Sequence, residues 1–111
     1  MQLESKKFLF DIQQAAGLIA EFVKHKDFSV YEKDPMLRAA VERQFEIIGE
    51  ALRRLLEEDP PTAARISEHA RIIAFRNILA HGYADIDDRI VWGIVESNLP
   101  TLLKEVDALL K

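Results

Sequence analysis

The sequence predicts an all-α protein, built as an antiparallel bundle of four to five helices. Three observations predict this class. Apolar residues recur at three- and four-residue steps through most of the chain, which is the spacing of one helix face. Only four glycines and four prolines interrupt these segments, and no useful strand pattern or internal repeat is visible. At 111 residues the chain has the usual size of one domain, so we expect a single domain over residues 1–111.

A first helix is expected over roughly residues 3–26. Its apolar positions form one stripe: Phe8, Ile12, Ala15, Ile19, Phe22 and Val23. The basic residues Lys24, His25 and Lys26 follow this stripe, and positive charge in a last turn complements the negative end of the helix dipole. We therefore interpret His25 as a charge at the helix C-terminus.

The second helix is expected to begin at Asp34-Pro35 and to end near residue 58. Asp accepts hydrogen bonds from free amides at an N-cap, and Pro has no amide to leave unpaired at the first helical position. The apolar stripe that follows is Leu37, Val41, Phe45, Ile48, Leu52 and Leu55. The Pro60-Pro61 pair then ends the helix.

Arg38, Glu42, Glu46 and Glu50 stand four residues apart on the opposite face of this helix. The face is either a solvated surface with an Arg38–Glu42 ion pair, or an interface or site. Gly49 also has two interpretations, because glycine costs a helix about 1 kcal/mol relative to alanine. Its missing side chain serves close helix packing, or it lets the third helix or a second subunit approach to form a cleft.

The third segment runs from Thr62 to about Leu79, either as one helix or as a short turn followed by a longer rod. Gly82 comes just past its last turn, where a left-handed glycine cap is common. The acidic run Asp85-Ile86-Asp87-Asp88 suits the start of a fourth helix. Its stripe is Ile90, Ile94, Val95, Leu99, Leu102, Val106 and Leu109, and Pro100 should kink or restart it.

The composition restricts the class of function. A formal charge of −4 argues against coating nucleic acid through bulk charge, although a local basic cleft remains compatible with it. The absence of cysteine excludes disulfides, thiolate nucleophiles and cysteine-ligated zinc. The N-terminus has no signal-peptide pattern, and no apolar run is long enough to span a membrane. We expect a soluble, cytoplasmic protein.

The polar residues Arg76, Asn77, His81 and Tyr83 crowd one expected helix end, beside Gly82. Asn77 and His81 are one turn apart, so we expect the amide to contact the imidazole and orient it. The helix dipole favours a cationic imidazole there, which suits proton transfer, and Arg76 offers a guanidinium for phosphate oxygens. His81 could move the proton of an RNA 2′-hydroxyl or protonate the leaving oxygen, while Arg76 stabilises the charged phosphorus centre. A cyclic phosphate would form without a metal ion.

Geometry complicates this hypothesis, because Arg76 lies about 7.5 Å from His81 along a straight helix and about 140° around it. A bend at Gly82, a second subunit, or both must bring the two groups together. The alternative is purely structural. His81 is then a helix-terminal charge, Arg76 pairs with Glu46 or Glu50, Asn77 is a surface residue, and Tyr83 packs over the turn.

Residues 75–83 resemble the Arg-Asn-X-X-X-His-X-Tyr signature of the HepT family, a branch of the HEPN superfamily, and residues 38–51 resemble the second helix of that family. The resemblance covers nearly the whole chain. It implies a homodimeric HEPN-like bundle, the toxin of a type VII toxin–antitoxin system, that cleaves RNA with Arg76 and His81, supported by Asn77.

The resemblance also implies a partner, a nucleotidyltransferase antitoxin of the MntA type that transfers AMP to the motif tyrosine, here Tyr83. The added phosphate and purine would occupy the cleft that binds RNA. Arg38, Arg43, Glu46 and Glu50 are further candidates for cleft or phosphate contacts, with surface ion pairs as the equal alternative for the two arginines.

Two other functions compete with this hypothesis. The chain could be a non-catalytic helical module that binds a nucleotide or a nucleotidyltransferase partner. A carboxylate-bridged metal protein is disfavoured, because no histidine has a glutamate three positions before it, and we expect no metal or other cofactor. His69 is interpreted as a surface residue, and Trp92 as a core or dimer-interface residue.

Overall fold

The computed structural model describes residues 1–82 and 86–111. Its helices are α1 (Leu3–Val23), α2 (Phe28–Lys33), α3 (Pro35–Glu58), α4 (Pro60–Ala63), α5 (His69–His81) and α6 (Asp88–Leu110). No strand is present in this described part of the chain, so the predicted all-α class is confirmed. Four of the helices are long and correspond to the expected segments, whereas α2 and α4 are short additions at their junctions.

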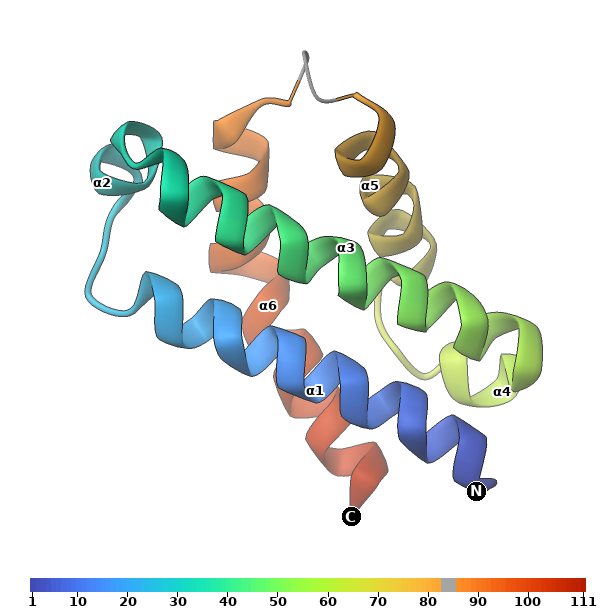
Figure 1. The fold of residues 1–111 in the computed structure, drawn as a ribbon. Helices are drawn as coiled ribbons and strands as arrows, with labels where there is room; N and C mark the ends of the chain where they lie inside the picture. The colour runs from blue at the N-terminus through green and yellow to red at the C-terminus, as the bar shows by residue number, and fades with distance from the viewer. Residues whose placement is uncertain (83–85) are drawn as a thin grey trace.

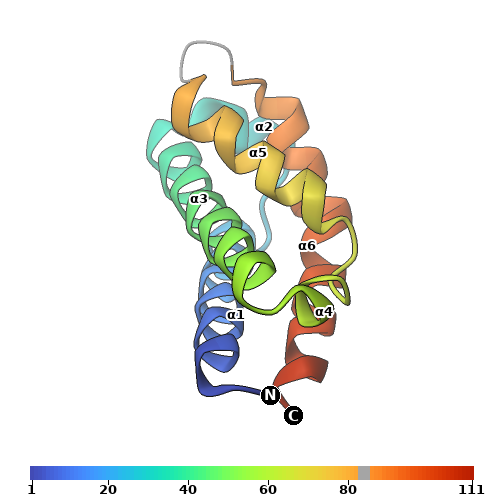
Figure 2. The same ribbon diagram turned by 90° about the vertical axis from the view of Figure 1, so that its right-hand side faces the viewer.

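The four long helices pack around one core, with α1 and α3 at the centre of the arrangement. α3 lies antiparallel to α1 and also supports α5, whereas α6 packs against α1 on the far side (Figure 1). Figure 2 shows the same arrangement from the side, with α5 leaning on α3 and both chain termini at the opposite end of the molecule from the C-terminus of α5. The end of α5 is therefore remote from both termini.

The first helix ends three residues before the expected boundary. Lys24 leaves the helical conformation, and His25 takes a left-handed conformation with φ of 62°. Asp27 then caps α2 by accepting a hydrogen bond from the Val30 amide over 3.0 Å. His25 is therefore an exposed turn residue beyond the helix and not a charge within its last turn.

The expected start of α3 is confirmed. Asp34 accepts from the Leu37 amide over 3.1 Å, and Pro35 occupies the first helical position. All six apolar residues predicted for this helix are buried. At its other end Asp59 accepts from Thr62 in α4 and, over 2.8 Å, from the Ser5 hydroxyl in α1.

The expected interruption of the third segment is also confirmed, since α4 and α5 are separate helices. Gly82, however, is not a left-handed cap, because its φ is −106°. Its amide donates to the Ile78 carbonyl over 2.7 Å, and a Cβ at this position would stand 2.9 Å from that oxygen. Glycine is needed here for close approach to a carbonyl group and not for a positive φ.

The last helix begins as expected at the acidic run, where Asp87 accepts from the Arg89 amide over 2.9 Å. Asp85 lies outside the described residues. α6 continues through Pro100 without a restart. Pro100 has no amide to donate to the Glu96 carbonyl, but both residues are exposed, so water can hydrogen-bond to that carbonyl instead. The predicted stripe is shifted at its start, with Val91 buried and Ile90 58% exposed.

The core is formed by apolar side chains from every described helix and includes two aromatic pairs. Trp92 is buried, as expected, and lies 5.2 Å from Tyr31 between ring centroids. Phe45 and Phe75 meet edge to face and join α3 to α5. None of the described helices combines the length and the apolar character that crossing a membrane requires.

Candidate active site

Gly49 allows α5 to lie directly against α3. A Cβ at this position would stand 2.2 Å from the Arg76 Cβ and 2.7 Å from its Cγ, both far inside van der Waals contact. Gly49 is itself buried. The interpretation of Gly49 as a point of close helix packing, here between α3 and α5, is therefore confirmed.

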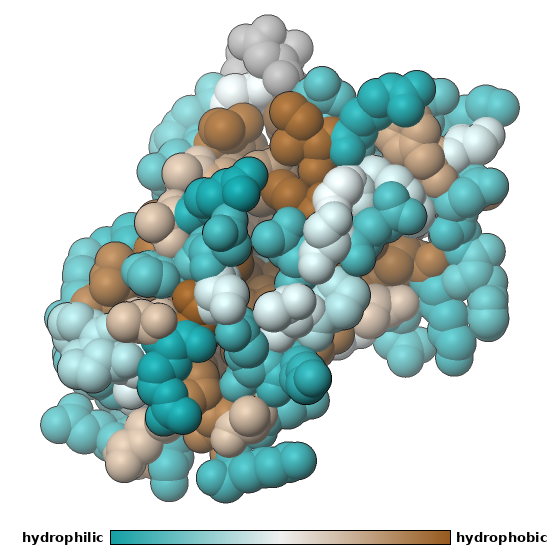
Figure 3. All heavy atoms as spheres, turned by 180° about the vertical axis from the view of Figure 1, so that it is seen from behind, coloured by the Kyte–Doolittle hydropathy of each residue, from teal (hydrophilic) through white to brown (hydrophobic). Residues whose placement is uncertain are grey.

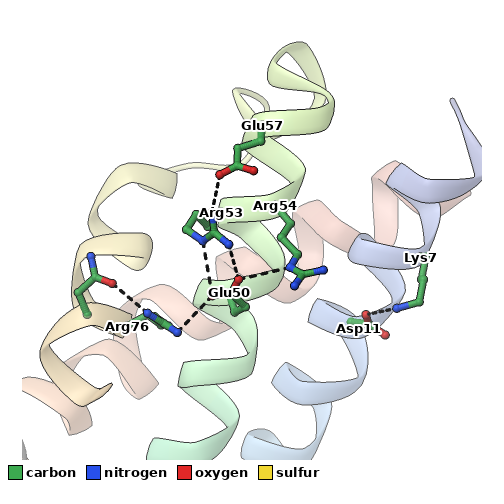
Figure 4. Close-up of polar contacts among 8 residues, drawn as sticks. Lys7, Asp11, Glu50, Arg53, Arg54, Glu57 and Arg76 are labelled. Atoms are coloured by element: carbon green, nitrogen blue, oxygen red, sulfur yellow. Dashed lines mark hydrogen bonds and ion pairs between the residues drawn. The ribbon is translucent and has the colours of Figure 1, made fainter. Parts of the chain in front are cut away.

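The Arg76 side chain leaves α5 and lies along α3 (Figure 4). Its Nη2 stands 3.2 Å from Glu50 Oε2, and its Nη1 donates to the Asn77 side-chain oxygen over 3.2 Å. The side chain is 28% exposed, so the guanidinium is held in place but still reachable from solvent.

Glu50 is contacted by two more arginines from its own helix. Arg53 approaches Oε1 at 2.6 Å and Arg54 approaches the same oxygen at 3.4 Å. The hydrogen bond from Arg53 is the main reason that the pKa of Glu50 is lowered, with Arg54 and Arg76 adding to it. Glu50 is therefore an ionised carboxylate among three guanidinium groups.

His81 is the last residue of α5, and it is exposed. The expected hydrogen bond between Asn77 and His81 is not formed among the described residues. The Asn77 oxygen instead accepts from Arg76, because the bent arginine stem brings Nη1 within reach of the next residue in the chain. Tyr83, the expected site of modification, lies outside the described residues.

The other candidate residues of α3 are spread along the helix. Arg38 does not pair with Glu42 as expected, because it lies 3.8 Å from Asp88 and donates to the Glu32 carbonyl. Arg43 pairs with Glu46 at 3.7 Å on the surface. Among the described residues, the ion pair between this set and the motif is that of Glu50 with Arg76.

Two grooves lie beside α5 and the helix α3 on which it packs. The polar groove, of about 290 Å³, lies between α1 and α3 and is lined by Arg43, Glu46, Glu50, Arg54, Arg76 and Lys7, among others. Its positive side chains are contributed by three different helices. It is the hollow into which the Arg76 guanidinium points.

The apolar groove, of about 240 Å³, lies between α5 and α6 and is lined mainly by Ile72, Phe75, Ile78, Ile90, Ile94 and Leu102. α5 packs on α3 and α6 packs on α1, with few contacts between α5 and α6 themselves. Figure 3 shows apolar side chains gathered at the upper part of this face. Ile78 and Ile90 are 54% and 58% exposed, so large apolar surface meets solvent here.

Arg53 and Arg54 are members of the site that the sequence prediction missed. Their spacing of three and four residues after Glu50 was the available signal, because such pairs are neighbours on a helix surface. His69, expected on the surface, is half-buried, with Nδ1 3.2 Å from the Ile66 carbonyl. Within residues 1–82 and 86–111, no group of three or more His, Asp or Glu side chains is arranged to hold a metal ion.

The class of this helical protein is defined by a family model. The model described as "Ribonuclease HepT-like" matches residues 12–109, which include both α3 and the Arg76 to His81 motif. The chain therefore belongs to the HepT-like ribonuclease family, as its two motifs indicated.

Several proteins with ribonuclease names are similar over almost the full length. A "Putative RNase" of Methanocaldococcus jannaschii is 36% identical over 102 residues, covering 92% of this chain and 93% of its own. A "Putative RNase" of Caldanaerobacter subterraneus is 32% identical, with 96% and 94% covered. The "Probable ribonuclease HepT" of Thermococcus cleftensis is 33% identical, and both chains are covered in full. None of the solved structures matches this chain.

Proposed function

We propose that this chain is an endoribonuclease toxin that cleaves RNA without a metal ion, with Arg76 and His81 as its catalytic pair and Asn77 as a supporting residue. One observation carries the proposal. In a chain of the HepT-like ribonuclease family, the motif arginine is held by two polar contacts beside a groove, while the motif histidine is exposed at the end of the same helix.

The chemistry requires a proton to be removed and a negative charge to be stabilised. His81 accepts the proton of a ribose 2′-hydroxyl, and the 2′-oxygen attacks the adjacent phosphorus. The bond to the 5′-oxygen breaks and that oxygen is protonated, by the imidazolium or by water. The products are a 2′,3′-cyclic phosphate and a 5′-hydroxyl. Arg76 offers N–H groups to the oxygens on which charge develops.

Cleavage of labelled RNA by the purified protein tests this proposal. We expect the wild type to cleave in excess EDTA, and Arg76→Ala and His81→Ala to lose at least about 100-fold in rate. Arg65→Ala and His25→Ala are matched controls, because both side chains are exposed and lie outside the motif. Equal cleavage by the wild type and both motif variants would contradict the proposal and favour a non-catalytic binding module, which the Arg76–Glu50 ion pair also suits.

We also propose that the active form is a homodimer whose subunits meet at the apolar groove. Ile78 stands one helical turn before His81, so a second copy seated on Ile78 and Ile90 lies next to the end of α5. Because Arg76 points to α3 within one subunit, a second subunit is a direct way to complete the site around His81.

The regulation that we propose is transfer of AMP to Tyr83 by an MntA-type nucleotidyltransferase antitoxin. Tyr83 follows His81 by two residues, so a nucleotide there adds negative charge and bulk next to the proposed base. Intact-mass measurement after co-expression with a neighbouring nucleotidyltransferase gene tests this. A mass gain in multiples of AMP, lost in Tyr83→Phe, is expected, and no gain with an active transferase would contradict it.

A further inference from the structure

The Arg76 guanidinium is held by one residue of the motif, Asn77, and by one residue outside it, Glu50. An arginine stem is long and flexible, and a free one loses that freedom when substrate binds. Here Nη2 is paired with Glu50 Oε2 at 3.2 Å, and Nη1 donates to Asn77 over 3.2 Å. The two contacts use different nitrogens, so together they set both the position and the plane of the guanidinium.

The Glu50 carboxylate is itself fixed. Its Oε1 accepts from Arg53 over 2.6 Å and from Arg54 over 3.4 Å. Its Oε2 accepts from Arg53 Nε over 3.5 Å and pairs with Arg76 (Figure 4). These contacts to Glu50 come from three arginines, and they lower the pKa of the carboxyl, so the group is ionised at neutral pH. The carboxylate is thus a rigid anchor and not a mobile surface charge.

The backbone geometry brings this anchor to the correct place. Glu50 follows Gly49, and Gly49 is the point at which Arg76 Cβ rests on α3. The close approach of the two helices therefore presents the carboxylate next to the arginine that must be held. A larger residue at position 49 would move α5 away from Glu50.

The charge of this group does not oppose an anionic substrate. Three guanidinium groups contact Glu50, and that of Arg53 also pairs with Glu57. The formal charge of the group is still positive after both carboxylates are counted. Glu50 can therefore hold Arg76 while the free N–H groups of the guanidinium face solvent and a phosphate.

We propose that Glu50 is a positioning residue that holds Arg76 ready for the phosphate in the cleavage step. This inference rests on the proposed ribonuclease function. A positioning residue affects the rate of the chemical step, whereas an ion pair with a purely structural role affects mainly the stability of the fold. Positioning also differs from inhibition by Glu50, because removing an inhibitory carboxylate would raise the rate.

Steady-state cleavage by Glu50→Gln tests the proposal against Glu57→Gln. Both variants remove one carboxylate that contacts Arg53 on the same helix, but only Glu50 contacts Arg76. We expect kcat to fall about 10- to 100-fold in Glu50→Gln, with KM unchanged or lower, and to stay at the wild-type value in Glu57→Gln. Equal rates in the wild type and Glu50→Gln, a faster Glu50→Gln, or equal losses in the two variants would overturn the proposal.

A double-variant cycle asks whether Glu50 acts through Arg76. In an Arg76→Lys background we expect Glu50→Gln to have little further effect on kcat, because the group that it positions has been replaced. Full additivity of the two losses would show that Glu50 acts elsewhere and would overturn the inference.

A measurement that does not depend on RNA cleavage tests the positioning of Arg76 independently of the proposed ribonuclease function. Nitrogen-15 NMR of the arginine side chains reports rotation of the Arg76 guanidinium, with Arg76→Lys identifying its signals. We expect slow rotation in the wild type and in Glu57→Gln, and fast rotation in Glu50→Gln. Fast rotation in the wild type would disprove positioning. Slow rotation in a wild type that cleaves no RNA would mean that the positioning exists and the proposed function is wrong.

Discussion

At the scale of single residues, two glutamates of α3 have opposite electrostatic environments. Glu50 is surrounded by arginines, and its pKa is lowered. The pKa of Glu42 is raised, mainly by burial and next by the nearby charge of Asp88, despite the attraction of Arg38. The charge of Glu42 therefore opposes folding, whereas that of Glu50 is stabilised by its partners.

We expect Glu42→Gln to raise the Tm at neutral pH. A carboxyl whose pKa is higher in the folded state than in the unfolded state binds more protons when folded. Its stabilising effect is complete below the ordinary value of 4.5 and is lost as the pH rises through the raised pKa. Thermal unfolding between pH 4 and 8 checks this. The gap between variant and wild type should grow with pH, and a constant gap would show that the effect is not electrostatic.

A second residue-scale prediction concerns Tyr31, which is fully buried and whose hydroxyl has no hydrogen-bond partner among the described residues. Tyr31→Phe keeps the ring against Trp92 and removes the unpaired hydroxyl. We expect the free energy of unfolding to stay the same or to rise by roughly 1 kcal/mol. Tyr31→Ala, which removes the ring as well, should cost about 3–5 kcal/mol. A large loss in Tyr31→Phe, measured by chemical denaturation, would reveal a polar partner for the hydroxyl.

At the residue level, the sequence anticipated one contact of the motif and missed others. The alternative in which Arg76 pairs with Glu50 is what the structure shows. The expected Asn77–His81 hydrogen bond is not formed among the described residues, because residue spacing fixes the positions of Cβ atoms but not the path of a long arginine stem. That path depends on the neighbouring helix, which helical spacing within one segment does not include.

At the scale of the elements, the contact between α3 and α5 depends on one glycine. Gly49→Ala improves intrinsic helix propensity, yet its Cβ would stand 2.2 Å from Arg76 Cβ. We expect crowding to dominate, with a loss of about 1–3 kcal/mol in the free energy of unfolding.

Gly17→Ala is the matched control for this change. Gly17 is inside α1 with nothing within 4 Å of an added Cβ, so only helix propensity changes. We expect a gain of up to about 1 kcal/mol in chemical denaturation. A gain in both variants would mean that α5 can move away from α3 at little cost.

The long helices could be predicted because their apolar stripes and caps are local signals. The Asp34-Pro35 start of α3 and the six buried residues of its stripe match the expectation. α2 was missed because six residues are too few to show a helical period. Ile90 was assigned to the core because it fits the stripe of α6, but its side chain is 58% exposed because none of the described helices covers that part of the face.

At the scale of the whole molecule, the apolar groove between α5 and α6 is the expected dimer interface. Exposed apolar patches of this kind often mark contacts with other proteins. We expect Ile78→Asp and Ile90→Asp each to shift the protein toward monomer in analytical ultracentrifugation and to lower the cleavage rate in parallel. Leu18→Asp, at a 44% exposed position on α1, is the matched control and should leave both unchanged.

Two results would contradict this assignment. A wild type that is monomeric at all concentrations would remove the dimer. A dimer that resists both isoleucine substitutions but dissociates in Leu18→Asp would move the interface to α1.

Gly49 and Glu50 are adjacent in the chain, but we expect the two positions to be retained under different conditions during evolution. The atom nearest to Gly49 is the Cβ of Arg76, which every residue except glycine carries, so the need for glycine persists even in a descendant that has lost the arginine. Glu50 pairs with the charged end of Arg76 on α5, so its identity should drift once that end is lost. Among descendants, glycine at the first position would mark the inherited fold, and glutamate at the second would mark a site still in use.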